Sequence, residues 1–463
     1  MLRIKIVILL LLIGPSGFSK TEIFGTAQMS NSEWVFLYEI DDFITRSETL
    51  IQKFKTNREG RFYFEIDNDC TKRYVIRRNN TFTELYLQPN STYKIILPTE
   101  SVEVIPYFSG KEVELLFIEL DTSDINFKIL GFEAWLDDEM ADLYLLKDAD
   151  PTKFIDGVLK FKIDVLNAYK TDTSKYFISH IKYVLGKTID NINYFGGPNE
   201  AEKFSFYIKD QEIQYDLPAY MDYFKDYYSG ILQKLNPTAK KMVSFALSNG
   251  SASQLAKGLM TDSLIPNLKI AELVGMHIIA EEYNNKSIAQ NQLIKIAQFL
   301  EDNSSFTPNK IIARNLNKQF FKLVSGDALP PLNLGENKYL GLKGSYQYVH
   351  FFDPENPQSL SEIKALKALH EKYGNQIGFV SIYLESKPKD STFRNRVLKY
   401  VDWPVYELPY YHPIWKKLNV GTFPYYILID PYLIIESMPA LGPVPNGLYE
   451  TIAKRFFSIV RNN

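Results

Sequence analysis

The period of apolar and polar positions changes twice along the 463-residue chain, which divides it into three regions. In the first region, residues 21–105, short runs of β-branched and aromatic residues alternate with polar turn signals such as Asn57-Arg58-Glu59-Gly60. Short strands at this near-regular spacing predict a small β-sandwich. The expected strands are 22–27, 34–40, 61–66, 74–78, 84–87 and 93–97.

In the second region, residues 110–322, apolar residues recur at three- and four-residue spacing, which predicts helices. Two such stretches are 113–118 and 154–161. Residues 218–228 place Tyr and Phe at helical spacing, and we interpret them as helix-packing core rather than an aromatic ligand groove.

In the third region, residues 325–463, expected strands and helices alternate. The order is β-α-β followed by β-β-α, because two strands form a hairpin around Asp430-Pro431. The expected elements are strand 346–352, helix 359–373, strand 376–384, a helix at about 390–399, the hairpin 425–437 and helix 447–460.

These patterns predict a multidomain α+β protein. We expect a β-sandwich domain at 20–107, an α-helical domain at 108–324 and an α/β domain at 325–463. Residues 1–19 resemble a cleavable signal peptide, with Arg3 and Lys5 before an apolar run and a cut after Ser19. The run is too short to span a bilayer and no other segment is long and apolar enough, so we expect a periplasmic or extracellular protein.

The composition of the chain disfavours several classes of function. The net charge of −3 offers no basic excess for a phosphate backbone, so nucleic-acid binding is disfavoured. A single cysteine, Cys70, excludes an intrachain disulfide, a dithiol redox pair and a cysteine-based zinc cage. The five histidines include no pair at i, i+4 and no H-E-x-x-H run, so we expect no metal and no cofactor.

The third region resembles a thioredoxin-like domain of the TlpA-type disulfide reductase family. Residues 328–334 (ALPPLNL) resemble the family's x-A-P-x-F-x-L segment, and residues 420–430 (VGTFPYYILID) resemble its V-x-G-x-P-x-x-x-L-I-D segment. The resemblance implies that Pro424 follows a cis peptide bond. It also implies a peptide-binding edge near that proline. The β-rich first region has the pattern of N-terminal domains that precede such domains in secreted proteins of Bacteroidota.

One departure changes the expected chemistry. Where relatives carry Cys-x-x-Cys, this chain has Asn356-Pro357-Gln358-Ser359. Disulfide exchange needs an attacking thiolate and a second thiol that resolves the mixed disulfide. Ser359 would need an activating base, for which Glu355 and Glu362 are candidates by proximity alone. The usual site is therefore predicted to be redox-inactive.

Such a domain could still bind an extended peptide by strand addition. We expect Thr422 and Phe423 to supply backbone groups and Pro424, Pro357 and Trp403 to line an apolar groove beside Asn356, Gln358 and Ser359. The identity of the partner and the oligomeric state are not readable from sequence.

Two other function classes compete with a binding protein. One is a thiol-disulfide oxidoreductase of this family acting through Cys70 and a partner's thiol. The other is a hydrolase in the helical region, where no G-x-S-x-G elbow is present. We interpret His412 as a loop residue and His350 as a strand residue with a satisfied side chain.

Overall fold

The computed structural model describes most of the chain after residue 19. The described residues are 20–28, 33–78, 81–98, 111–192, 194, 196–285, 287–320, 323, 325–335, 338–341, 343–354, 356–385, 399, 401–409, 412–445 and 450–462. The expected signal peptide and the helix expected at 390–399 lie outside this set, except for residue 399.

The described chain forms two compact units. Unit 1 contains the described residues up to residue 98 together with Glu112–Leu316, and unit 2 contains the described residues from Asn317 onward. The β-rich and helical regions thus pack together in unit 1.

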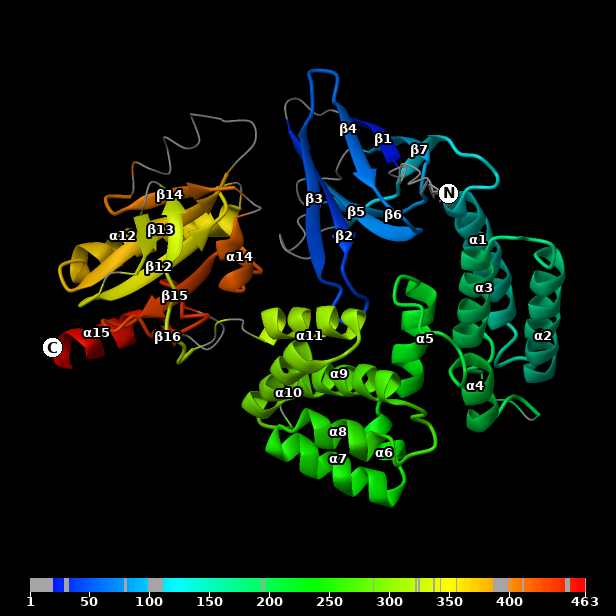
Figure 1. The fold of residues 1–463 in the computed structure, drawn as a ribbon. Coiled ribbons are helices and arrows are strands. Elements are labelled where there is room, and N and C mark those ends of the chain that lie inside the picture. Colours follow the sequence, from blue (N-terminus) through cyan, green and yellow to red (C-terminus); the bar gives the residue numbers. More distant parts are fainter. Residues whose placement is uncertain are drawn as a thin grey trace, which may run out of the picture. The chain divides into compact units, whose positions relative to one another are not determined.

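Unit 1 contains two β-sheets (Figure 1). They share one hydrophobic core. The first has the strand order β4 (Arg61–Asp67), β1 (Lys20–Ala27), β7 (Thr92–Leu97) and β9 (Leu116–Glu119). The second has the order β3 (Glu48–Lys55), β2 (Trp34–Ile40), β5 (Lys72–Arg78), β6 (Thr81–Leu87) and β8 (Lys111–Glu112). Side chains from both sheets, including Phe64 of β4 and Ile76 of β5, are buried in this core. This is the packing of a β-sandwich.

The helical interpretation of residues 113–118 is wrong. Leu116–Glu119 form β9, which pairs antiparallel with β7. Consecutive apolar residues in a short run fit a strand as well as a helix, so their spacing alone does not separate the two.

Helices follow the sandwich from residue 125 to residue 320. They are α1 (Ile125–Tyr144), α2 (Pro151–Ala168), α3 (Lys175–Thr188), α4 (Glu200–Tyr207), α5 (Pro218–Tyr228), α6 (Ile231–Lys234), α7 (Pro237–Asn249), α8 (Ala252–Leu259), α9 (Leu268–Asn285), α10 (Gln290–Asn303) and α11 (Thr307–Phe320). The aromatic run is α5, where Tyr220, Tyr223, Phe224 and Tyr228 are fully buried, so its interpretation as packing core is confirmed.

Buried polar contacts join the sandwich to the helices. The side chain of Asn126, in the first turn of α1, donates to the Tyr86 carbonyl and accepts from the Tyr86 N–H, both at 2.8 Å. Asn315 of α11 donates to Asp42 Oδ2 at 2.9 Å. Because a buried polar group is costly without a partner, these contacts fix the helices on the sandwich.

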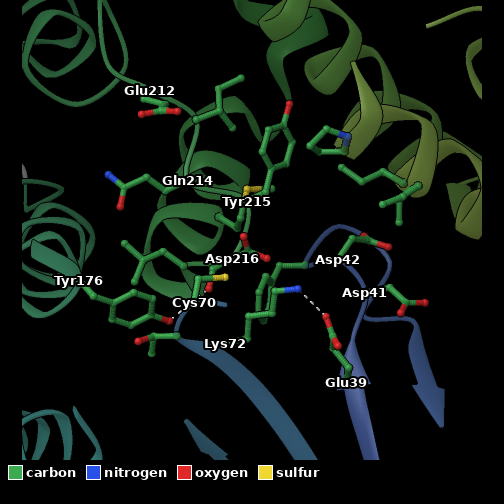
Figure 2. Close-up of a pocket in the computed structure, with 18 of the residues that line it drawn as sticks. Glu39, Asp41, Asp42, Cys70, Lys72, Tyr176, Glu212, Gln214, Tyr215 and Asp216 are labelled. Atoms are coloured by element: carbon green, nitrogen blue, oxygen red, sulfur yellow. Dashed lines mark hydrogen bonds and ion pairs between the residues drawn. The ribbon is translucent and has the colours of Figure 1, made fainter. Parts of the chain in front are cut away.

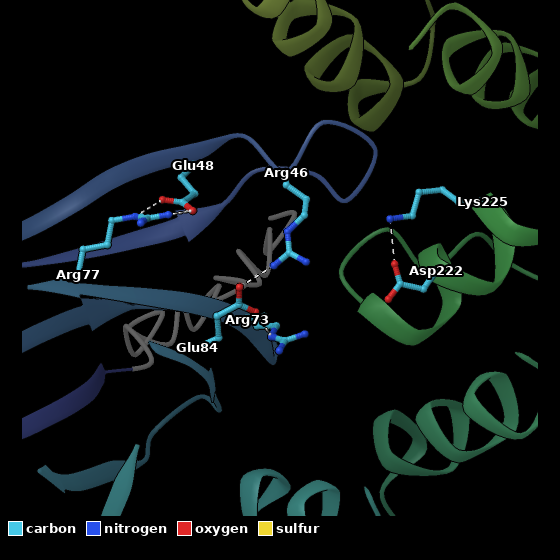
Figure 3. Close-up of polar contacts among 7 residues, drawn as sticks. All are labelled: Arg46, Glu48, Arg73, Arg77, Glu84, Asp222 and Lys225. Carbon is cyan, nitrogen blue, oxygen red and sulfur yellow. Dashed lines mark hydrogen bonds and ion pairs between the residues drawn. The ribbon is translucent and has the colours of Figure 1, made fainter. Parts of the chain in front are cut away.

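An ion-pair cluster lies on the sheet that contains β5 and β6 (Figure 3). Glu84 has a side chain only 6% exposed, and its two oxygens lie 2.5 Å from Arg46 Nη2 and 2.6 Å from Arg73 Nε. The contact with Arg73 is an ion pair without hydrogen-bond geometry, and the Arg73 guanidinium also lies over the Tyr86 ring. Arg77 and Glu48 form a bidentate pair on the same sheet.

We expect Glu84→Gln to lower the free energy of unfolding of unit 1 by about 2–3 kcal/mol. The substitution leaves the half-buried Arg73 guanidinium without its counter-charge. The matched control is Glu119→Gln, whose exposed pair with Lys94 should contribute less than about 1 kcal/mol. Urea unfolding with pulsed hydrogen exchange and mass spectrometry reads unit 1 peptides separately. Equal losses in the two variants would contradict the assignment.

Unit 2 is built on a five-stranded sheet. Its order is β14 (Val405–Leu408), β13 (Ile377–Leu384), β12 (Tyr346–Phe352), β15 (Tyr425–Ile429) and β16 (Ile435–Ser437). Strands β12, β13 and β14 run parallel to one another. Strand β15 is antiparallel to β12, and β16 is antiparallel to β15. Strands β10 (Leu332–Gly335) and β11 (Lys338–Leu340) form a separate two-stranded sheet.

Helices and side chains form a hydrophobic cluster on each face of this sheet. One cluster contains Leu366 of α12 (Pro357–Tyr373) and Phe456 of α15 (Ala453–Asn462). The other contains Trp415 of α14 (Pro413–Lys417), with Val349 and Phe351 of β12. Alternate residues of β12 thus point to opposite cores, which fixes the register of the central strand.

Candidate functional site

The candidate site lies where β12 leads into α12. Asn356 is the N-cap of α12, and its Oδ1 accepts from the backbone N–H groups of Gln358 at 2.9 Å and Ser359 at 3.2 Å. Pro357 occupies the first turn, where a missing N–H costs nothing. Asparagine is a favoured N-cap because its side chain replaces the absent intrahelical acceptor.

The same side chain reaches the loop before β15. Asn356 Nδ2 donates to the Phe423 carbonyl at 3.2 Å, and the Phe423–Pro424 peptide bond is cis, as expected. The structure therefore brings the 356–359 segment next to the 422–424 segment. Asn356 joins the two segments by hydrogen bonds.

Exposure differs among the residues of this site. Gln358 and Thr422 are exposed and Pro424 is half-buried, whereas Phe423 is 7% exposed with its ring edge-on to Trp415. Within the described part of the chain, no hydrogen bond joins the backbone groups of Thr422 to another residue. The side chain of Pro357 lies outside the described set.

Among the described residues, no base contacts Ser359. Its side chain is fully buried, and its Oγ has no hydrogen-bond partner among the described residues. Glu362, one of the two expected bases, instead accepts from the Tyr426 hydroxyl at 2.5 Å and from Gln358 Nε2 at 3.2 Å. The other, Glu355, lies outside the described residues. A serine that is buried and unactivated is no nucleophile.

Trp403 does not lie in this group. Its ring packs on His370 and Phe379, its indole N–H donates to Ser381 Oγ at 2.8 Å, and it is 7% exposed. It belongs to the hydrophobic cluster of α12 and α15, whereas Phe423 belongs to the cluster of α14. The structure assigns Trp403 to the core, and the expectation that it lines the groove is not met.

A buried polar network that the sequence did not reveal lies behind the site. His350 of β12 is 2% exposed and stacks between Phe352 and Tyr426. Its Nδ1 lies 3.2 Å from Ser381 Oγ, but its Nε2 has no partner among the described residues, so the side chain is only partly satisfied. Burial lowers the pKa of His350 to about 3, so the ring is neutral at physiological pH.

The environment of Cys70 disfavours a reactive thiol. Cys70 is a free, half-buried cysteine in the loop before β5. Burial, followed by the nearby Asp216 carboxylate, raises the pKa of the thiol to about 11. The thiolate, which is the nucleophile, is therefore scarce at neutral pH.

Other chemistries find little support in the described residues. No group of three His, Cys, Asp or Glu side chains there is arranged to hold a metal ion. His412 lies just before α14, where its Nδ1 accepts from the Ile414 N–H at 3.3 Å, as expected of a loop histidine. None of the described helices combines the length and apolarity needed to cross a membrane.

No protein-family model and no curated protein matches the chain. Solved structures that it resembles include the thioredoxin domain of a thiol-disulfide oxidoreductase from Bacteroides vulgatus, 15% identical over 30% of this chain and 97% of that chain, with a TM-score of 0.23. A thiol:disulfide interchange protein from a Bacteroides species is 18% identical over 26% of this chain and 85% of that chain, with a TM-score of 0.23. A thioredoxin-like protein from Bacteroides caccae is 12% identical over 63% of this chain and 95% of that chain, with a TM-score of 0.27.

Proposed function

We propose that unit 2 is a TlpA-type thioredoxin-like domain without disulfide chemistry, which binds an extended peptide or protein segment at the edge formed by Asn356, Gln358, Thr422 and Pro424. The observation that carries this proposal is the double role of Asn356, which caps α12 and holds the Phe423 carbonyl. An amide thus performs a structural task at the position where the resemblance expects the attacking sulfur.

The chemistry of the residues supports the loss of redox activity. Thiol exchange needs two sulfur atoms in turn, and unit 2 contains no cysteine. The remaining thiol, Cys70 in unit 1, is held in its protonated form by burial. Its environment therefore counts against the alternative of an oxidoreductase that acts through Cys70.

The proposed binding mode is addition of a strand. Thr422 is exposed and its backbone groups are not engaged by other described residues, so an incoming peptide backbone could hydrogen-bond there. Pro424 is half-buried and offers apolar surface, and the exposed Gln358 offers an amide whose Nε2 donates to Glu362. In strand addition most of the hydrogen bonds are made by the peptide backbone, so partner segments of varied sequence can bind.

We also propose that the protein is exported. The N-terminal pattern of residues 1–19 supports a signal peptide cleaved after Ser19. With a single cysteine, the exported chain would depend on core packing rather than on intrachain disulfides for its stability. N-terminal sequencing of protein secreted from a bacterial host tests this, and a mature chain that still begins at Met1 would contradict it.

The binding proposal is tested with S-carboxymethylated insulin B chain, an extended peptide that cannot exchange thiols. We expect the full chain to bind a fluorescein-labelled sample in an anisotropy titration. Thr422→Pro, which removes the backbone N–H, should weaken binding at least ~10-fold, a loss of about 1.4 kcal/mol. Thr422→Ala keeps the N–H and should bind within about twofold of the parent. Unchanged affinity in Thr422→Pro would contradict strand addition at this edge.

A further inference from the structure

A cavity of about 750 Å³ opens within unit 1 (Figure 2). The end of β2 and the loop after it supply Glu39 and residues 41–43, and the start of β5 with the loop before it supplies residues 70–72. The segment between α4 and α5 supplies residues 212–217, and α3, α5, α9 and α11 complete the wall. Cavities of this size hold small organic molecules or one or two side chains of a peptide.

Part of the wall is apolar. Phe43, Leu217 and Met221 are buried residues that line the cavity, together with the rings of Tyr176 and Tyr215. The Tyr215 hydroxyl donates to Asn309 Oδ1 at 2.7 Å and the Tyr176 hydroxyl donates to the Asp216 carbonyl at 3.1 Å. Since their hydroxyls are held, both rings are fixed in place as apolar surface. The Tyr215 ring already carries a cation, because Lys269 Nζ lies 5.3 Å from its centroid.

The charged lining residues are mostly acidic. Five carboxylates face two lysines, Lys72 and Lys269. The carboxylates belong to Glu39, Asp41, Asp42, Glu212 and Asp216. Lys72 is already paired, because its Nζ lies 2.7 Å from Glu39 Oε1. The cavity therefore carries more negative charge than its own cations neutralise.

Three of the acids, Glu39, Asp41 and Asp42, have partners within the protein, whereas the Asp216 carboxylate has none among the described residues. Asp42 accepts from the N–H groups of Ile44 and Thr45 and from Asn315, and Asp41 accepts from Thr49. No hydrogen bond or ion pair among the described residues engages the Asp216 carboxylate. Asp216 is exposed to solvent, and partial desolvation by the surrounding wall raises the pKa of its carboxyl. Lys72 opposes this rise, and Glu39 and Asp69 add to it. A cation placed beside Asp216 would stabilise the charged form of its carboxyl and lower this pKa.

We propose that this cavity binds an organic cation, an amine or guanidinium on an apolar or aromatic body, with the cationic group at Asp216 and the apolar body against the wall of Phe43, Leu217 and Met221. Two kinds of ligand combine a cationic group with an apolar body in this way: a free aromatic amine and a basic side chain of a peptide. The binding site is independent of the peptide edge proposed for unit 2.

Calorimetric titration of the full chain tests the proposal with three probes. Phenethylamine represents the free amine, phenylalanyl-arginine amide the peptide, and 3-phenylpropionate an aromatic of similar size and opposite charge. We expect at least one cationic probe to bind, and the probe that binds identifies the source. No binding of either cation, or equal binding of 3-phenylpropionate, would overturn the proposal.

A charge-neutralising variant locates the site. Asp216→Asn should weaken the cationic probe at least ~10-fold, because it removes one charge-assisted contact. Glu114→Gln removes an exposed acid outside the cavity wall and should leave the affinity unchanged. Equal affinity for the parent and Asp216→Asn would overturn the proposal, provided that both variants show the parent's thermal unfolding.

Cys70 supplies a second readout that does not depend on any substitution at Asp216. It lines the cavity and is the single cysteine of the chain, so alkylation of the protein reports on this position alone. At pH 9, a saturating cationic probe should slow the reaction with iodoacetamide at least ~5-fold by blocking access. An unchanged rate would place the bound probe elsewhere and contradict the proposal.

Discussion

The double variant Asn356→Cys/Ser359→Cys should reduce insulin disulfides with dithiothreitol as the electron source, at a rate at least ~10-fold above the parent chain. The two positions are the N-cap and third residue of α12. Side chains three residues apart on a helix face each other, at a separation compatible with a disulfide.

The local environment favours thiol chemistry once sulfur is present. A cysteine at a helix N-terminus has a lowered pKa because the helix dipole and free N–H groups stabilise the thiolate. Ser359 Oγ is buried without a partner among the described residues, so a less polar sulfur atom should be accommodated there. The substitution at Asn356 removes the hydrogen bond to the Phe423 carbonyl and frees that edge.

Single variants and the remaining thiol provide the controls. Asn356→Cys alone and Ser359→Cys alone should stay near the parent's rate, since each lacks the resolving or the attacking sulfur. Cys70→Ser in the double variant should leave the gain intact. A parent chain that already reduces insulin, with the activity lost in Cys70→Ser, would contradict the proposed absence of redox function.

The second large effect concerns acid stability. Unit 2 should lose about 1.4 kcal/mol of its free energy of unfolding for each pH unit between about pH 6 and pH 4 through His350 alone. The pKa of His350 is about 3 in the folded state and about 6.5 when exposed. Between these values the unfolded chain binds a proton that the folded chain does not, so stability falls as pH falls.

Two variants isolate this contribution from that of the carboxylates. His350→Phe keeps a ring between Phe352 and Tyr426 and should reduce the pH dependence by the stated amount. Ser381→Ala removes a partner of the imidazole but keeps the titrating group, so its pH dependence should resemble the parent's. Pulsed hydrogen exchange of β12 peptides through a urea series at pH 7 and pH 4.5 measures both. An unchanged slope in His350→Phe would refute a neutral, buried His350.

Sequence reasoning predicted the elements whose pattern is local. The strands 346–352 and 425–429 and the helix that begins near Ser359 follow from apolar runs bounded by turn and cap signals. The cis bond before Pro424 and its closeness to Asn356 followed from the resemblance of one segment.

Features that depend on tertiary packing were missed. Strand β3, with exposed apolar residues such as Leu50, has no clear alternation and was not predicted. Trp403 was expected to line the groove but lies in the hydrophobic cluster of α12 and α15. The sequence does not show which hydrophobic cluster an isolated tryptophan enters. The pairing of Glu362 with Tyr426 joins residues 64 positions apart, and the cavity of unit 1 is lined by segments from residue 39 to residue 312. No spacing rule connects such positions.

The central proposal, a peptide edge on a thioredoxin-like unit without thiol chemistry, is tested most directly by a hydrogen-exchange footprint. Exchange is measured on the full chain with and without saturating S-carboxymethylated insulin B chain. Slower exchange confined to peptides covering 356–359 and 420–426 is the predicted result. Binding that leaves those peptides unprotected, or no binding at all, would contradict it.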